Sequence, residues 1–405
     1  MTAPVPSVVY VVPDKMGGMM NIVANLLEYR CSDGFSYHAV LTHNHLHTDT
    51  RFAGPLRADT QTIVEYTLPV ENLYTVIRRV ARAIGAGTGV VVAGDLLDLA
   101  ALSVHDTGRA VVLILHGDHE YYYDLAVKHA AVVHAYVAYS RRMYEQLIER
   151  LPNRHDSIFY IPYGVPIPAR ARRPVAGPLR LIFAGRLEHE QKGVLDLPEI
   201  DRALADRGID ASWTIVGAGP DEARLRAAWC RNPQVNWLGQ RTNPEVLDLL
   251  ARHDVFVLPT RHEGFPVALV EAMAAAVVPV VSNIASGVPE IVSDGVTGER
   301  LPVGDVRAFA EAIGALDQDR AKLDAMSTAA RRTVADRFDI RLRVCDYQAL
   351  YARWRQLYRP LASGHLQYGS RLDQPWIPNA LVRFVRSTMR RRRGHEAIRS
   401  EVVHA

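Results

Sequence analysis

The sequence contains few cysteines and no long apolar run. Its three cysteines, Cys31, Cys230 and Cys345, lie far apart and form no metal-ligand spacing, which favours a reduced, cytosolic protein without a disulfide framework. No apolar stretch approaches the roughly 18 residues of a membrane-spanning helix. The first residues lack the basic segment of a signal peptide. We therefore expect a cytoplasmic protein.

Length and charge narrow the possibilities further. A chain of 405 residues suits two domains rather than one, and 48% hydrophobic residues is typical of a globular protein. The net charge of +3 is unevenly distributed: residues 361–405 carry eight arginines against three acidic residues, or +5, so the remainder carries about −2. The body of the protein therefore has no charge excess suited to nucleic acid, and we expect no nucleic-acid partner.

Apolar strands alternate with helical stretches along most of the chain. Strands of this continuous kind are typical of parallel sheets that helices cover on both faces. A segment rich in Pro and Arg, VPIPARARRPVAGP from residue 165, has no periodicity and is interpreted as a linker. The sequence thus predicts two α/β domains, 1–170 and 171–340. The expected strands are 7–12, 90–94, 110–116 and 131–140 in the first domain, and 179–185, 212–219, 234–239, 253–259 and 277–283 in the second.

Glycines and polar residues follow many of these strands. In open parallel sheets, ligands bind beyond the carboxyl ends of the strands. If the two sheets face each other, the groups at their strand ends converge in a cleft. In the first domain these groups are Gly17-Gly18, Gly94-Asp95 and His116 to His119; in the second they are Gly185-Arg186, Gly217 to Gly219, Gly239 and residues 261–266.

The stretch RHEGFPVALVE (261–271) combines a tight corner with the start of a helix. Pro266 suits the first helical turn and predicts a helix that begins there. The free N–H groups of Gly264, Phe265, Val267 and Ala268 then point at the strand-end cleft. A helix N-terminus preceded by glycine is an anion site well suited to phosphate.

Two carboxylates flank this corner. Glu263 precedes the helix, and Glu271 lies eight positions later in an apolar run. A buried carboxylate needs hydrogen-bond donors, and the vicinal hydroxyls of a ribose or a sugar are suitable ones. The structural alternative is that Glu263 only complements the helix dipole and Glu271 pairs with an arginine. The strand-end position favours the binding role.

This region resembles the nucleotide-sugar-binding signature of the family 4 retaining glycosyltransferases. The likeness extends over residues 262–305, with Glu263 and Glu271 as the E-x7-E core and GVPEIVSDGVTG behind it. LIFAGRLEHEQKGVLDL, YIPYGV and VVPDKMGGMMNIVANL resemble three further family elements, in family order, from about residue 8 to 350. The resemblance implies the GT-B fold, an α/β architecture of two facing Rossmann-like domains. It also implies a helix at 343–358, within the segment 341–360, that crosses back to the first domain.

The resemblance assigns roles to residues of the second domain. Glu271 would accept hydrogen bonds from the nucleotide ribose, and Glu263 would hold the donor sugar's hydroxyls. Amides near residues 265–267 would bind the sugar or the diphosphate. Arg186 and Lys192 would bind the diphosphate and stabilise the charge that grows on it as it leaves.

Further residues receive weaker assignments. Gly17 and Gly18 would let the backbone approach the diphosphate and the acceptor. His116 would contact the donor sugar, although a satisfied histidine at a strand end is the structural alternative; His119 is a weaker candidate. Arg241 lies where the family often contacts the base, or it is a surface arginine. Independently of the resemblance, Gly217 is interpreted as backbone close to a ligand.

The resemblance implies a retaining glycosyltransferase that uses a UDP- or GDP-sugar, with no metal and no other cofactor. Its acceptor would be a carbohydrate or a lipid-linked molecule, in glycan, glycolipid or polysaccharide biosynthesis. Two alternatives stay open: a two-domain sugar-nucleotide epimerase, and a non-catalytic sugar-nucleotide-binding protein. Tyr121, Tyr122 and Tyr123 either stack on an acceptor sugar or contribute packing.

The basic tail at 361–405 has amphipathic character. Read as a helix from Asn379, QPWIPNALVRFVRSTMRRRRGH (374–395) places Leu381, Val382, Val385 and Met389 near one face. Such a segment suits an anionic membrane surface. We expect either peripheral contact with the inner membrane face, or a solvated tail or packing patch. The arginines in this segment are Arg383, Arg386 and Arg390 to Arg393.

Overall fold

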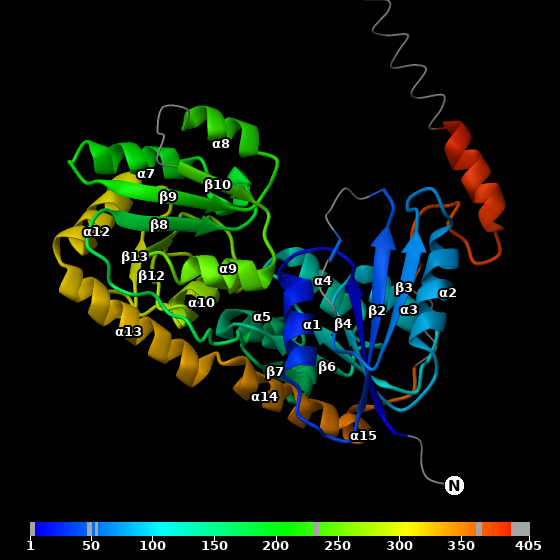
Figure 1. The fold of residues 1–405 in the computed structure, drawn as a ribbon. Coiled ribbons are helices and arrows are strands. Elements are labelled where there is room, and N and C mark those ends of the chain that lie inside the picture. The colour runs from blue at the N-terminus through cyan, green and yellow to red at the C-terminus, as the bar shows by residue number, and fades with distance from the viewer. Residues whose placement is uncertain (1–4, 47–50, 53–55, 230–234, 362–366, 390–405) are drawn as a thin grey trace, which may run out of the picture.

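The computed structural model describes residues 5–46, 51–52, 56–229, 235–361 and 367–389. Two α/β halves lie side by side, and a run of helices extends from the second half along the first (Figure 1). The chain has the GT-B fold that the sequence predicts. The predicted boundary at residue 170 falls between the last strand of the first sheet and the first strand of the second.

The first half contains a parallel sheet of seven strands within the described residues, in the order β3-β2-β1-β4-β5-β6-β7. Helices α1 to α5 and the 3₁₀ helix η1 connect these strands. The strands are β1 (Ser7–Pro13), β2 (Ser36–Asn44), β3 (Thr60–Tyr66), β4 (Gly89–Ala93), β5 (Ala110–Ile114), β6 (Ala135–Ala138) and β7 (Ile158–Tyr160). The helices are α1 (Gly18–Glu28), α2 (Leu73–Ile84), α3 (Leu96–Val104), α4 (Glu120–Lys128), α5 (Arg141–Arg150) and η1 (Pro152–Ser157).

The second half contains six parallel strands within the described residues, in the order β10-β9-β8-β11-β12-β13. The strands are β8 (Leu179–Ala184), β9 (Ala211–Val216), β10 (Val235–Gly239), β11 (Val255–Leu258), β12 (Val278–Ser282) and β13 (Glu299–Leu301). The helices are α6 (His189–Lys192), α7 (Asp196–Ala205), α8 (Glu222–Ala228), α9 (Asn243–Leu250), α10 (Val267–Ala274), α11 (Val288–Ile291), α12 (Val306–Gln318) and α13 (Arg320–Arg337).

Burial explains which strands the sequence predicts. Every residue of β4 and β5 is buried, as expected for central strands of a parallel sheet with both faces covered. The strand β3 lies at the sheet edge and most of its residues are exposed, so its polar sequence TQTIVEY gives no apolar run. The sequence pattern therefore predicts the central strands and misses the edge strands β3, β7 and β13, together with the mixed strand β2.

The chain crosses between the two halves twice, and the crossings are hydrogen-bonded to each other. The Val165 N–H donates to the Phe338 carbonyl at 2.9 Å, and the Ile340 N–H donates to the Val165 carbonyl at 3.0 Å. Beyond this point, α14 (Ile340–Ala352) and α15 (Trp354–Leu357) run along the first half (Figure 1). The predicted crossing helix is thus present, but it begins at residue 340 and is interrupted at Arg353.

The crossing helix is fixed to the first half by buried tyrosines. Tyr347 and Tyr351 of α14 are both buried, and the hydroxyls of Tyr351 and Tyr10 lie 3.1 Å apart. Within the described residues, no helix combines the length and the apolar character needed to cross a membrane.

The C-terminal segment forms the expected helix, described over residues 379–389, and packs on the first half, which is one of the alternatives left open by the sequence. Val382 is buried, and Arg386 donates a hydrogen bond of 2.6 Å to the Glu71 carbonyl of the first half and pairs with Asp373 of its own segment at 2.6 Å. Asn379 accepts a hydrogen bond from the Asn72 N–H at 2.8 Å. The exposed apolar side chains are instead Trp376, Leu381, Phe384 and Met389. Residues 390–393 lie outside the described residues.

The predicted linker contains a buried anchor to the second half. The Arg172 guanidinium pairs with Asp254 at 2.8 Å, and Arg180 pairs with the other oxygen of the same carboxylate at 2.8 Å. Burial alone would raise the pKa of Asp254, but hydrogen bonds from Arg180 and Arg172 lower it below its ordinary value. The linker therefore joins the second domain before its first strand begins.

We predict that Asp254→Ala lowers the free energy of unfolding by about 3–5 kcal/mol, because it removes the buried partner of Arg172 and leaves that guanidinium only the more exposed Asp324. Urea unfolding followed by circular dichroism measures this change. The matched control is Asp336→Ala, which removes an exposed ion pair with Arg332 and should cost less than about 1 kcal/mol. Equal effects of the two substitutions would contradict the anchoring role.

Candidate active site

The site centres on the N-terminus of α10, at the carboxyl edge of the second sheet. The helix begins at Val267, one residue later than predicted, and Pro266 has extended backbone at the N-cap position. No side chain in the described part of the chain caps this end. The first N–H groups of a helix have no intrahelical partner, and the helix dipole adds positive potential there. This end is therefore suited to an anion.

Glu263 lies just before this helix, with its side chain 7% exposed and paired with a cation. Its carboxylate forms an ion pair with the Lys192 ammonium and accepts a hydrogen bond from the Thr260 hydroxyl at 3.0 Å. The neighbouring Gly193 has a φ of +64°, and a Cβ there would lie 2.0 Å from the Pro259 carbonyl oxygen. Only glycine permits this close approach, which brings Lys192 to Glu263.

Glu271 is buried inside α10. The Asn243 side-chain amide, at the start of α9, donates a hydrogen bond of 2.5 Å to the Glu271 carboxylate. Burial raises the pKa of Glu271 to about 7, and this hydrogen bond lowers it only in part. A carboxylate has about four acceptor positions, so further donors such as hydroxyls would stabilise its ionised form.

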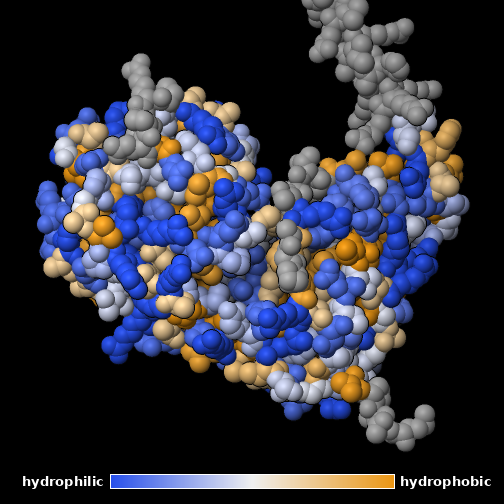
Figure 2. Space-filling model, viewed as in Figure 1, coloured by the Kyte–Doolittle hydropathy of each residue, from blue (hydrophilic) through white to orange (hydrophobic). Residues whose placement is uncertain are grey.

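Two loops of the first half contact this helix end. A Cβ on Gly264 would lie 2.8 Å from the Asp118 amide nitrogen, and Gly117 is equally close, so the backbones touch here. On α1, a Cβ on Gly18 would lie 4.0 Å from a methyl group of Val267. The structure thus brings residues 261–266 close to the predicted strand-end group His116 to His119, and α10 close to Gly18. Figure 2 shows the surface notched between the two halves.

His116 lies at the end of β5 next to this contact. Its Nδ1 is buried and has no hydrogen-bond partner among the residues that the structure describes. Burial lowers the pKa of His116 to about 3, so the imidazole is neutral at pH 7. A Cβ on Gly94 would lie 2.5 Å from its Nε2, so the ring packs directly on the backbone after β4. The described structure thus does not satisfy the histidine fully, which favours the site over the structural alternative.

The other predicted site residues differ in burial: two arginines are exposed, whereas Phe265 is buried. Arg186 is exposed and its guanidinium lies 3.4 Å from Glu188. Arg241 is exposed, two positions before the Asn243 that contacts Glu271. Phe265 is buried, with its ring 6.4 Å from Tyr139 and 5.8 Å from Phe338; its side chain therefore packs, and its backbone is the part available to a ligand.

The predicted glycines differ in whether a side chain would fit at their positions. Gly17 has open space around it at the N-terminus of α1. A Cβ on Gly217 would lie 1.8 Å from the Gly185 carbonyl oxygen. Backbone packing alone therefore requires glycine at 217, and a ligand role there stays a prediction.

Sequence reasoning missed three residues that organise the site. Asn243 and Thr260 hydrogen-bond the two carboxylates, but neither belongs to a recognisable motif. Glu290 of α11 accepts hydrogen bonds from the Arg141 N–H at 2.6 Å and the Tyr160 hydroxyl at 2.8 Å. Its position in GVPEIV was noted, but only the structure shows that it bridges the two halves.

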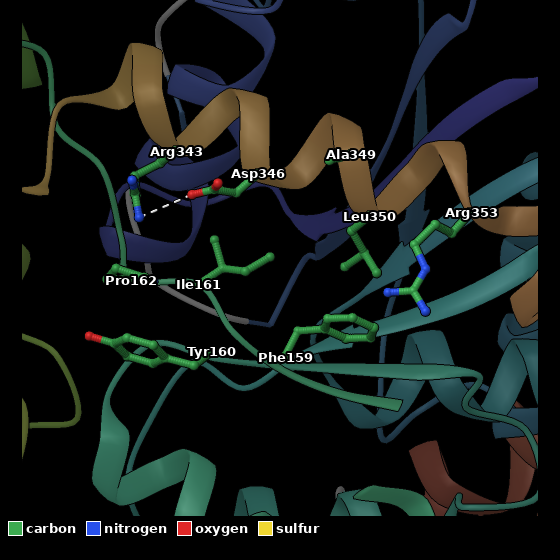
Figure 3. A pocket seen from close by; sticks show the side chains of 9 residues that line it. All are labelled: Phe159, Tyr160, Ile161, Pro162, Arg343, Asp346, Ala349, Leu350 and Arg353. Carbon is green, nitrogen blue, oxygen red and sulfur yellow. Dashed lines mark ion pairs between the residues drawn. The ribbon is translucent and has the colours of Figure 1, made fainter. Parts of the chain in front are cut away.

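A separate pocket of about 360 Å³ lies between β7 and α14 (Figure 3). Phe159, Ile161 and Leu350 contribute apolar side chains, and Arg343 and Asp346 form an ion pair of 3.0 Å at one end. This pocket contains none of the predicted site residues and lies beside the interdomain crossing.

The structure is that of a GT-B protein, with Glu263 and the buried Glu271 on either side of the uncapped N-terminus of α10. Residues 178–319 match the family described as glycosyl transferases group 1. This match falls within the second domain and confirms the resemblance that the E-x7-E region indicated.

Similar proteins include glycosyltransferases of polysaccharide synthesis. The chain is 36% identical over 189 residues to the putative colanic acid biosynthesis glycosyltransferase WcaL of Escherichia coli, covering 44% of this chain and 46% of the relative. It is 34% identical over 226 residues to the glycogen synthase of Mycobacterium tuberculosis, covering 52% and 48%. The chain thus spans about half the length of the curated relatives it matches.

Solved structures show the same fold over most of the chain. HepE of Anabaena, in complex with UDP and glucose, has a TM-score of 0.69 at 18% identity and covers 85% of this chain and 99% of its own. Sucrose-phosphate synthase of Thermosynechococcus elongatus has a TM-score of 0.70 at 16% identity, covering 86% and 98%.

We predict that Glu271→Gln becomes progressively more stable than the wild type as the pH rises from 5 to 8. Because the folded-state pKa of about 7 exceeds the ordinary value of 4.5, the folded wild type holds a proton that the unfolded chain releases. Wild-type stability therefore falls across this range, by up to about 3 kcal/mol, and the neutral glutamine removes that loss. Urea unfolding at both pH values tests this; a difference independent of pH would contradict the raised pKa.

Proposed function

We propose that the protein is a retaining, metal-independent glycosyltransferase that uses a nucleotide-diphosphate sugar, a UDP- or GDP-sugar, in polysaccharide, glycolipid or other glycan synthesis. The observation that carries the proposal is the arrangement at α10: the buried Glu271 and the Glu263 side chain, which is 7% exposed, lie on either side of an uncapped helix N-terminus, and Lys192 pairs with Glu263. The pairing of hydroxyl acceptors with an anion site matches a nucleotide sugar. That HepE binds UDP-glucose and WcaL is a putative colanic acid glycosyltransferase supports the same class.

In this proposal, the diphosphate occupies the helix end and the two carboxylates hold the hydroxyls on either side. The ribose hydroxyls donate to Glu271, which favours its ionised form. The donor sugar's hydroxyls donate to Glu263. Lys192 has three N–H donors, so it can keep Glu263 and also contact the diphosphate.

The transfer step needs stabilisation of the leaving group more than it needs a protein base. As the bond from the sugar to the phosphate oxygen breaks, negative charge grows on the diphosphate, where Lys192, Arg186 and the N–H groups of α10 stabilise it. The acceptor hydroxyl attacks on the same face and passes its proton to the leaving phosphate oxygen. The neutral imidazole of His116 can form a hydrogen bond with a sugar hydroxyl through Nδ1 or through Nε2.

The direct test incubates the protein with UDP- and GDP-sugars and follows free nucleotide and sugar products, with and without glycan acceptors. The proposal expects nucleotide release that acceptors accelerate and that Glu263→Gln abolishes. Isomerised donor without nucleotide release would identify an epimerase instead. Donor binding without any turnover would identify a binding protein.

We predict that Lys192→Gln and Arg186→Ala each lower kcat by about two to three orders of magnitude, because each removes a charge from the leaving diphosphate. Glutamine is chosen at 192 because it keeps a hydrogen bond to the buried Glu263. The control is Arg332→Ala on the exposed face of α13, which should leave kcat unchanged. Near-normal kcat in both Lys192→Gln and Arg186→Ala would overturn the assigned roles.

We further expect activity to persist in EDTA. Loss of activity in EDTA that Mg²⁺ restores would overturn metal independence.

We also propose that the C-terminal helix brings the cleft to a lipid-linked acceptor at an anionic membrane. Trp376, Leu381 and Phe384 are 76%, 53% and 70% exposed, although the segment itself is fixed to the first half. Large apolar side chains held outward beside the exposed Arg383 suit the interface of an anionic bilayer. Hydrophobic residues surround the base of the C-terminal trace in Figure 2.

We predict that the double variant Trp376→Ser, Phe384→Ser loses most binding to phosphatidylglycerol vesicles in a flotation assay. The wild type should float, and less so at high salt, since its arginines contribute electrostatic attraction. Point variants are preferable to a deletion, which would also expose the surface that Val382 covers. Val296→Ser, at an exposed valine of the second domain, is the control; equal flotation of the wild type and the double variant would refute the proposal.

A further inference from the structure

An exposed aromatic group lies at the carboxyl edge of the first sheet, at the start of α4. The rings of His119 and Tyr122 lie 4.9 Å apart, those of Tyr121 and Tyr122 5.2 Å apart, and His119 stacks on Tyr121 at 6.2 Å. His119 is exposed, Tyr122 is partly buried, and Tyr121 is 46% exposed. A contiguous group of exposed aromatic rings is a candidate binding surface.

The third tyrosine of this run has a different role. Tyr123 is buried, and its hydroxyl donates a hydrogen bond of 2.5 Å to Asp118, which also pairs with Arg142 at 2.9 Å. The tyrosines of HEYYYD therefore do not share one role. Tyr123 packs, whereas Tyr121 and Tyr122 lie on the surface.

A carboxylate joins the aromatic group from the next strand end. The Tyr121 hydroxyl donates to Asp95 at 2.5 Å, immediately after β4. Asp95 also caps α3 by accepting from the Leu96 N–H at 2.7 Å. The carboxylate remains partly exposed, so it can accept further hydrogen bonds.

Backbone contacts place this group beside the donor site. A Cβ on Gly117 would lie 2.8 Å from the Tyr122 ring, and Gly117 touches Gly264 at the end of α10. A Cβ on Gly94, next to Asp95, would lie 2.5 Å from the His116 ring. The group thus adjoins both His116 and the loop that follows Glu263, from the opposite domain.

We propose that Asp95, His119, Tyr121 and Tyr122 form the subsite for the terminal sugar of the acceptor, an inference that rests on the proposed function. Aromatic rings offer a flat apolar surface to the C–H face of a sugar, and a carboxylate accepts from its vicinal hydroxyls. The negative charge of Asp95 disfavours a phosphate at this position. The subsite therefore takes a neutral or amino sugar and leaves any lipid diphosphate of the acceptor outside it.

Three variants of the full chain separate the contributions. Tyr121→Ala removes the aromatic surface, Tyr121→Phe removes only the hydroxyl, and Asp95→Asn removes the charge while keeping a residue that caps helices well. The matched control is Tyr358→Ala. It breaks a similar pair, since the Tyr358 hydroxyl lies 3.1 Å from Asp106, ahead of β5 at the other edge of the sheet.

The first readout is direct binding of simple sugars. Saturation-transfer NMR, with UDP present, uses the methyl glycosides of glucose, galactose, mannose and N-acetylglucosamine as probes. The proposal expects saturation of at least one glycoside by the wild type and by Tyr358→Ala, and its loss in Tyr121→Ala. No saturation of any glycoside, or saturation that Tyr121→Ala leaves unchanged, would overturn the subsite.

The second readout separates this inference from the proposed function. Tyr121→Ala should raise the acceptor KM by about tenfold or more and Asp95→Asn by about three- to tenfold, with Tyr121→Phe affected least. Donor hydrolysis without acceptor should stay unchanged in all three. An unchanged acceptor KM, or equal loss of donor hydrolysis, would overturn the subsite alone, whereas a wild type that turns over no nucleotide sugar would overturn the proposed function.

Discussion

The buried ion pair between Glu263 and Lys192 is the interaction on which the site depends. It holds together segments that leave two neighbouring strands, β8 and β11, and it exists because Gly193 lets the backbone pass against the Pro259 carbonyl. A carboxylate so buried would be costly without its cation. The same pair fixes the corner that precedes α10, so one contact sets the positions of the helix N-terminus and of the Glu263 carboxylate.

The two halves meet through both backbone and side-chain contacts. Gly264 touches Gly117 beside the site, and Glu290 receives hydrogen bonds from the first half further out. Within the described residues, the chain passes between the two sheets only near Val165 and near Phe338, where the two crossings are hydrogen-bonded to each other. These contacts keep the loop around Glu263 next to the aromatic group at the start of α4, in the opposite half.

The sequence predicts the parts of the site whose residue types are themselves unusual. A glutamate inside an apolar run and a Gly-Phe-Pro corner at a strand end differ from an ordinary core pattern, so Glu263 and Glu271 could be predicted from the residues, whereas the GT-B fold followed from the family resemblance. Asn243 could not, because an asparagine at a helix start is ordinary and only folding brings it to Glu271. Edge strand β3 was missed because its residues are mostly exposed. The tail helix was foreseen, but its inward face depends on Asp373, which no periodicity reveals.

The most direct test of the account is a crystal structure of the protein soaked with UDP or GDP. The account predicts the diphosphate within hydrogen-bond distance of the Val267 and Ala268 amides and of Lys192, and the ribose hydroxyls on the Glu271 carboxylate. A nucleotide bound elsewhere, such as in the pocket between β7 and α14, or no bound nucleotide at saturating concentration, would contradict it.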